Sequence, residues 1–295
     1  MTKQQQLSQL EKQRIRRSFD AAAQRYDDVA VLQREVGNRI IERLDLIKLQ
    51  PKTILDVGAG TGVFSESLDK RYKQARVISL DLAPRMLQQA RQRKSWLARR
   101  LSTQALVCGD AEALPIADHS IDLIFSSLML QWCSDLEHTF AEFRRVLRPG
   151  GLLMFATFGP DTLKELRNSW LAADEGSRVH VHDFIDMHDV GDALMRAGLA
   201  DPVMDVEHFT LTYSDVYQLM RELKTLGAHN VATDRNHGLT GKTRLQRMAA
   251  AYEQFRQQGV LPATYEVVYG HAWGTERTAT DATFPISQLQ HSRPR

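Results

Sequence analysis

The sequence has little of what marks several large classes of protein. Its 295 residues include two cysteines, which are too few for a disulfide framework and are not spaced as zinc ligands. No apolar run in the sequence approaches the roughly 20 residues that a membrane-spanning helix needs. The formal net charge is only +2, so no strong overall field favours nucleic acid. We therefore expect a cytoplasmic protein that binds neither nucleic acid nor membrane, and its oligomeric state stays open.

The most informative feature that is present is a glycine-rich turn directly after a short apolar run. Residues 53–57 predict a buried parallel strand, and Gly58, Gly60 and Gly62 follow it. Glycines let the backbone turn sharply and approach a ligand closely. Residues 63–68 can begin a helix, whose unpaired backbone N–H groups would then lie at the turn. The arrangement predicts a binding turn of the kind that holds nucleotides.

Polar side chains also stand at the ends of the next three predicted strands. They are Asp81 in 76–82, Asp110 after 105–109, and Ser126 in 120–127. The carboxyl ends of parallel strands meet at the edge of the sheet where α/β proteins bind ligands, and an acid after the second strand can bind ribose hydroxyls. We therefore expect these side chains to line one site.

The remaining pattern predicts the rest of an α/β fold. Apolar residues recur at helical spacing over 136–147, the sequence Pro149–Gly151 should end that helix, and 152–158 should form a fifth strand. Two further strands are expected at 209–213 and 264–273. Strands that alternate with helices favour a doubly wound, mostly parallel sheet, here of seven strands.

Four stretches in the same order resemble the motifs of the class I S-adenosylmethionine-dependent methyltransferases. They are 56–62, 80–87, 109–115 and 146–151. A dehydrogenase is the weaker alternative, because the turn has the spacing Gly-x-Gly-x-Gly instead of Gly-x-Gly-x-x-Gly. The resemblance implies a Rossmann-like fold and S-adenosylmethionine as co-substrate.

The same resemblance assigns roles to the residues of these motifs. It implies that the glycine turn holds the amino-acid end of S-adenosylmethionine and that Asp81 holds the ribose. Asp110 and the Ala111 backbone would hold the adenine, on which Met86 would pack. The full set of expected cofactor-binding residues is Asp56, Gly58, Gly60, Gly62, Asp81, Leu82, Met86, Asp110, Ala111 and Ser126.

Residues 1–50 are expected to form an N-terminal helical arm. Within it, 19–27 resembles the lid that folds over the cofactor in many small-molecule methyltransferases, which makes Tyr26 a candidate wall of the methyl-transfer chamber. Packing of Tyr26 on the edge of the domain is an equally open alternative.

The rest of the chain is expected to be one methyltransferase domain, 51–276, followed by a tail. Two amphipathic stripes in 214–259 predict a helical cap inserted between the last two strands. Residues 277–295 carry few large apolar side chains and predict a disordered tail.

Later stretches resemble one family more closely, the malonyl-acyl-carrier-protein O-methyltransferases of biotin synthesis. They are 130–136, 157–166, 219–228 and 263–270, and the resemblance extends over 19–273. It implies methyl transfer to the free carboxylate of a malonyl group carried on acyl carrier protein. One departure is Ala59, where many members have Cys; a small side chain suffices there.

The chemistry that this resemblance implies needs no general base, because a carboxylate with a reference pKa near 4 is already ionised at neutral pH. Bringing that carboxylate into an apolar chamber costs several kcal/mol unless a cation meets it. The candidates to hold it are Arg221, Lys224 and Arg167.

Two alternative functions stay open on the same motifs. One is a methyltransferase that acts on a quinone or another small molecule. The other is a non-methylating relative that serves respiratory-complex assembly in a hydroxylase role.

Three stretches have a binding interpretation beside a simpler one. The basic runs 91–100 and 12–17 could dock an acidic carrier protein or could be solvated helix faces. The stretch 180–188 holds three histidines and Asp183, but a surface loop explains it more simply than a metal site, so we expect no metal.

Overall fold

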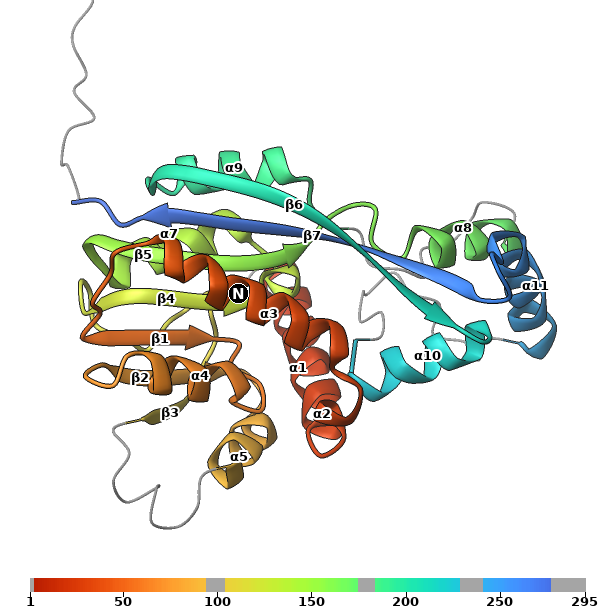
Figure 1. Ribbon diagram of the computed structural model, residues 1–295, viewed down its shortest axis with the longest axis horizontal. Helices are drawn as coiled ribbons and strands as arrows, with labels where there is room; N and C mark the ends of the chain where they lie inside the picture. The colour runs from red at the N-terminus through yellow and green to blue at the C-terminus, as the bar shows by residue number, and fades with distance from the viewer. Residues whose placement is uncertain (1–2, 94–103, 175–183, 229–240, 277–295) are drawn as a thin grey trace, which may run out of the picture.

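A seven-stranded sheet forms the centre of the molecule (Figure 1). The computed structural model describes residues 3–93, 104–174, 184–228 and 241–276, with side chains from residue 9 onward. In the order in which they lie side by side, the strands are β3 (Ala105–Cys108), β2 (Arg76–Asp81), β1 (Thr53–Val57), β4 (Ile121–Ser127), β5 (Leu147–Phe158), β7 (Leu261–Trp273) and β6 (Ala200–Tyr213). Only β7 runs antiparallel to its neighbours. The predicted α/β fold with a mostly parallel sheet is confirmed.

Helices cover both faces of this sheet. On one face lie α3 (Val31–Arg43) and α4 (Val63–Arg71), and on the other lie α7 (Leu136–Val146) and α9 (Met187–Arg196). Successive residues of a strand point to opposite faces, so Ile54 joins one apolar cluster and Leu55 joins the other. Because β1 and β4 are covered on both sides, their sequences are apolar runs without alternation.

Three strands are longer than the sequence predicts, and β7 is one of them, since it begins at Leu261 and not at Thr264. β6 begins at Ala200 and not at Phe209, because it is an edge strand that pairs with β7 alone and leaves alternate side chains in solvent. Its first half therefore contains acidic residues and Pro202, which are uncommon in strands, so the sequence did not predict a strand there. β5 begins at Leu147, so Pro149–Gly151 lies within an irregular stretch of strand instead of in a loop.

The N-terminal arm lies at the carboxyl edge of the parallel strands. It consists of α1 (Lys3–Ala22) and the short α2 (Tyr26–Val29), followed by α3. α1 packs on α5 (Pro84–Arg93), which follows β2. The Ser18 hydroxyl of α1 also donates a 2.8 Å hydrogen bond to the Gly227 carbonyl.

The long β6 and β7 extend beyond the other strands toward a second group of helices (Figure 1). This group consists of α8 (Lys164–Ala173), α10 (Val216–Thr225) and α11 (Lys242–Tyr252), with a 3-10 turn at Glu253–Phe255. Met248 and Tyr252 of α11 are buried, and the Tyr252 hydroxyl donates to the Pro262 carbonyl over 2.8 Å. Two more 3-10 turns, Leu44–Leu46 and Leu130–Trp132, follow α3 and β4.

Several sequence-based expectations lie outside the described residues. They are the tail 277–295, the part of the basic run from 94 to 100, and the histidine-containing stretch up to residue 183. His188 is described, and its ring contacts the Asp186 carboxylate over 2.8 Å. Among the helices that the structure describes, none combines the length and apolarity needed to cross a bilayer.

Candidate functional site

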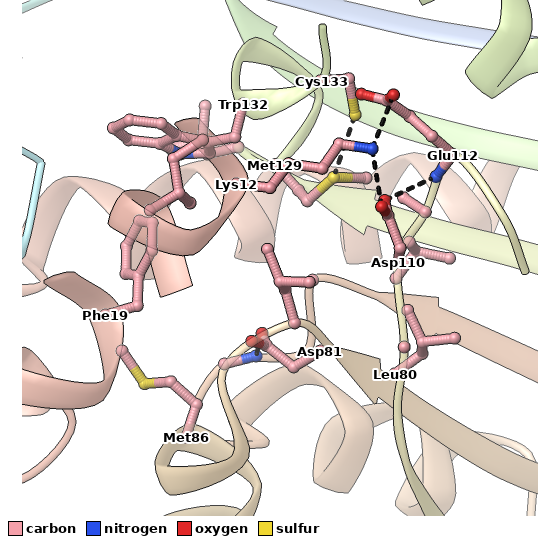
Figure 2. Close-up of a pocket in the computed structure, with 18 of the residues that line it drawn as sticks. Lys12, Phe19, Leu80, Asp81, Met86, Asp110, Glu112, Met129, Trp132 and Cys133 are labelled. Atoms are coloured by element: carbon pink, nitrogen blue, oxygen red, sulfur yellow. Dashed lines mark hydrogen bonds and ion pairs between the residues drawn. The ribbon is translucent and has the colours of Figure 1, made fainter. Parts of the chain in front are cut away.

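A cavity with about 740 Å³ of empty space lies beneath α1, where the parallel strands end (Figure 2). Its lining comes from α1, the turns after β1 and β2, the segment after β3, and the end of β4 with its following turn. The lining residues are Lys12, Ile15, Phe19, Tyr26, Val57, Gly58, Gly60, Leu80, Asp81, Leu82, Met86, Gly109, Asp110, Ala111, Glu112, Ser127, Leu128, Met129, Trp132 and Cys133.

The glycine turn forms the floor between β1 and β2. Its three glycines have positive φ angles of 75°, 55° and 81°, which disfavour any larger residue. A Cβ atom added to Gly58 would lie 2.5 Å from the Met129 side chain, so the close packing also requires glycine. The Gly58 N–H donates to the Leu80 carbonyl over 2.8 Å, which fixes the turn against the end of β2.

Asp81 stands at the end of β2 with both carboxylate oxygens engaged by the backbone. One oxygen accepts the Gly60 N–H and the other accepts the Ala83 N–H, each over 2.8 Å. Burial raises the pKa of Asp81 to about 6, although these two donors oppose the shift. The carboxylate is therefore held in one orientation on the cavity wall.

Asp56 has a different position from the other predicted residues. It is 2 % exposed and does not line the main cavity; its carboxylate accepts a 2.5 Å hydrogen bond from the Ser65 hydroxyl. Ser65 in turn accepts from the Ser79 hydroxyl, so this chain of bonds ties α4 to β1 and β2. Burial raises the pKa of Asp56 to about 7.

A second recess with about 480 Å³ of empty space continues from the cavity past the glycine turn. Tyr26, Gly58, Gly60 and Ser127 line both spaces. The recess adds Gln33 and Arg34 from α3, together with Asp56 and Thr61. Tyr26 thus lies where the two spaces meet, and burial raises the pKa of its hydroxyl, which stays a protonated donor at neutral pH.

The recess offers both a positive charge and an unused acceptor. Arg34 donates one hydrogen bond of 2.6 Å to the Asp27 carbonyl. The Gln33 side-chain oxygen is buried and has no hydrogen-bond partner among the described residues. An acceptor beside a guanidinium suits a ligand that carries an ammonium and a carboxylate, as an amino acid does.

Lys12 of α1 fastens the arm over the main cavity (Figure 2). Its ammonium lies 2.6 Å from an Asp110 oxygen and 2.7 Å from a Glu112 oxygen. Burial lowers the pKa of Lys12, but the two carboxylates outweigh burial and raise it above the ordinary value. Phe19, farther along α1, meets Trp132 edge to face with ring centroids 5.2 Å apart. A clasp of two ion pairs and one aromatic contact therefore holds α1 over the cavity.

Most of the predicted cofactor residues meet at this cavity. Gly58, Gly60, Asp81, Leu82, Met86, Asp110 and Ala111 line it. Gly62 instead begins α4, and an added Cβ there would lie 2.7 Å from the Ala90 side chain. Ser126 is fully buried, and its neighbour Ser127 lines the cavity, because successive strand residues face opposite sides.

The three cations predicted to hold a substrate carboxylate line neither space. Arg221 and Lys224 are exposed on α10. Arg167 of α8 donates to the Pro160 carbonyl over 2.9 Å and to the Thr162 carbonyl over 3.2 Å. The helical spacing of apolar residues predicted α8 and α10, but it did not show which of their polar residues reach the cavity.

Several residues of the site were not singled out from the sequence, among them Gln33, Arg34 and Trp132, and Lys12 was named only within the basic run 12–17. For α1 a signal existed, since Lys12, Ile15 and Phe19 recur at the spacing of one helix face. For α3 no signal existed, because its apolar stripe predicts packing on the sheet and says nothing of the polar residues beside the turn.

The chain is similar in sequence to known methyltransferases. Residues 55–155 match the family model described as "Methyltransferase domain". A malonyl-(acyl-carrier protein) O-methyltransferase of Methylovorus sp. is 54% identical over 266 residues, covering 90% of this chain and 89% of that protein. One from Coxiella burnetii, named malonyl-(acyl-carrier protein) O-methyltransferase 1, is 44% identical over 95% of this chain and 96% of its own length.

Solved structures show the fold independently of close sequence similarity. A putative methyltransferase from Bacillus halodurans matches with a TM-score of 0.57 at 17% identity, over 81% of this chain and 98% of that one. A phosphoethanolamine N-methyltransferase from Haemonchus contortus, solved with S-adenosylhomocysteine, matches with a TM-score of 0.51 at 16% identity, over 81% of this chain and 53% of that one. At such low identity these matches bear on the fold alone.

Proposed function

Because the chain belongs to the family of malonyl-acyl-carrier-protein O-methyltransferases, we propose that it transfers a methyl group from S-adenosylmethionine to the free carboxylate of malonyl-acyl carrier protein. The product, a malonyl methyl ester, would prime pimelate formation for biotin synthesis. The observation that carries the proposal is a cavity at the carboxyl edge of the parallel strands, partly covered by α1, in a chain whose relatives of this name match it over about nine-tenths of its length.

The residues of the cavity fit S-adenosylmethionine. The Asp81 carboxylate suits ribose hydroxyls, and Leu82, Met86 and Ala111 give apolar walls that suit adenine. The recess with Arg34 and Gln33 suits the amino-acid end of the molecule, next to the glycine turn. When bound, S-adenosylmethionine supplies a methyl group that its sulfonium charge has already activated.

What the chain itself contributes is alignment and exclusion of water. The acceptor carboxylate is ionised at neutral pH, so no residue has to remove a proton. Fixed alignment of two reactants can supply on the order of 7–11 kcal/mol of the barrier reduction. Phe19 and Trp132 close one side of the cavity, and Tyr26 stands between the cavity and the recess. These three side chains would shield the reacting groups from solvent.

Growth without biotin tests the proposal in a cell. A bacterial strain that lacks its own malonyl-acyl-carrier-protein O-methyltransferase should grow without biotin when it expresses this chain. Asp81→Ala should abolish that growth, since the carboxylate that suits the ribose is removed. Asp28→Ala changes an exposed acid of α2 and serves as the matched control that keeps growth.

The same experiment separates the alternatives. Absence of growth from cells that contain the folded protein would contradict the proposal. Rescue of a strain that lacks a quinone methyltransferase would support the small-molecule alternative instead. Growth that persists in the Asp81→Ala variant would contradict the assignment of this cavity.

A further inference from the structure

Two of the three cations that were expected to hold the substrate carboxylate lie on a surface beside the arm. Arg221 and Lys224 are exposed on α10, and Arg17 is exposed on α1. Arg14 of α1 is partly buried. We call these four residues the basic seam. Each is a positive side chain on one of two neighbouring helices.

The two helices of the seam are in direct contact. The Ser18 hydroxyl of α1 donates to the Gly227 carbonyl, just beyond α10, over 2.8 Å. A Cβ atom added to Gly227 would lie 3.1 Å from the Ser18 carbonyl oxygen, so the backbones approach closely. Arg14 precedes Ser18 by one helical turn, Arg17 adjoins it, and the Lys224 carbonyl accepts the Gly227 N–H over 3.1 Å. The four cations therefore belong to the two helices that meet at this contact.

The charge of the seam is not balanced within the described part of the chain. None of its four cations forms an ion pair with a described acid, and one Arg14 guanidinium nitrogen is buried without a hydrogen-bond partner. Glu222, the acid nearest in sequence on α10, accepts instead from the Tyr213 hydroxyl over 2.9 Å. By contrast, Arg43 on α3 reaches both Asp205 and Glu207. An unbalanced positive surface of this kind favours an acidic partner.

We propose that the basic seam docks the acidic surface of the acyl carrier protein that presents the acceptor group. This inference rests on the proposed function, since it identifies where the carrier of that function binds. The position fits the role, because the other face of α1 lines the cavity through Lys12, Ile15 and Phe19. A carrier on the seam is separated from the cavity by about one helix diameter, roughly 10 Å, which its flexible prosthetic arm can bridge.

Charge reversal on α10 tests the docking surface. Arg221→Glu with Lys224→Glu should weaken binding of the carrier on the order of tenfold or more, since like charges would then face each other. Isothermal titration of the protein with malonyl-acyl carrier protein measures this. The affinity for S-adenosylmethionine should stay unchanged. The seam variant should also lose most of the salt dependence that the unaltered protein shows in carrier binding.

A matched control makes the same change in charge elsewhere. Lys73→Glu with Arg76→Glu alters two exposed cations near the amino end of β2, away from the carboxyl edge, and should leave carrier affinity unchanged. The neutral pair Arg221→Gln with Lys224→Gln guards against misfolding and should give a smaller loss in the same direction.

Titration with the same carrier lacking its malonyl group separates docking from recognition of the carboxylate. Docking predicts that the seam variant loses affinity for both forms. A loss of affinity confined to the malonyl form would overturn the docking surface and indicate that Arg221 and Lys224 hold the carboxylate. Equal losses of affinity in the seam variant and the control variant would also overturn the docking surface. Binding to the seam without methylation of the malonyl form would uphold the docking surface and contradict only the proposed function.

Discussion

At the scale of single residues, the backbone of the glycine turn restricts which residues can stand at Gly58 and Asp81, and this is why both could be predicted. Gly58 must be glycine because of its positive φ and its contact with Met129, and Asp81 is held by two backbone N–H groups. Both constraints come from residues near in sequence or from the neighbouring strand end. Ser126 was misplaced by a single position, because the strand boundary does not say which of two serines faces the cavity.

The buried Asp56 predicts a pH dependence of folding stability. Its pKa is raised to about 7 in the folded protein, from an ordinary value of 3.8. Between these values the folded state binds more protons than the unfolded state, so the contribution of Asp56 to stability falls as pH rises from about 4 to about 7. Asp56→Asn removes this titration, and the difference in unfolding free energy between the two proteins should change across that window.

Urea unfolding at several pH values measures this difference, in which other titrating groups cancel. An exposed acid provides the control, since Asp28→Asn removes a carboxylate that lies on the surface of α2. A flat difference for Asp56→Asn would mean that Asp56 titrates in the folded protein as it does in the unfolded chain.

At the scale of elements, α1 is the part that the sequence predicted as a lid without showing how it is held. The ion pairs of Lys12 join residues about 100 positions apart in the chain, and no local pattern reports such a contact. The apolar stripes of α10 and α11 likewise predicted helices, but the placement of Arg221 and Lys224 depended on how α10 packs against the arm.

The Lys12 clasp predicts that α1 is stabilised by one side chain. Lys12→Met leaves the Asp110 and Glu112 carboxylates without their cation, and Glu112 is only 9% exposed. Loss of a partner from a largely buried polar group costs about 1–3 kcal/mol. We therefore expect a lower unfolding free energy and faster hydrogen exchange of the amides of α1.

Lys70→Met is the control for this prediction, since Lys70 pairs with Glu66 on the surface of α4 with 75% of its side chain exposed. Exposed pairs of this kind contribute little, about 0.3–0.5 kcal/mol. Equal effects of the two substitutions, or unchanged exchange in α1 of the Lys12 variant, would mean that α1 is held by its apolar contacts alone.

At the scale of the whole molecule, the alternation of strands and helices was enough to predict the sheet and the edge at which ligands bind. The cavity follows from that edge, and seven of the ten predicted cofactor residues line it. What could not be predicted is how α1 and α3 come together around the cavity and its recess, because those contacts join distant parts of the chain. For the same reason, the sequence did not show that the residues expected to receive the substrate carboxylate would line neither the cavity nor the recess.

Transfer of labelled methyl groups shows directly whether the malonyl carboxylate is the methyl acceptor. The protein would be incubated with methyl-labelled S-adenosylmethionine and either malonyl-acyl carrier protein or acetyl-acyl carrier protein, which lacks the free carboxylate. We expect label on the malonyl form alone, and mild base should release it, as it does from a methyl ester. Absence of label from the malonyl form, in protein that still binds S-adenosylmethionine, would contradict the proposal.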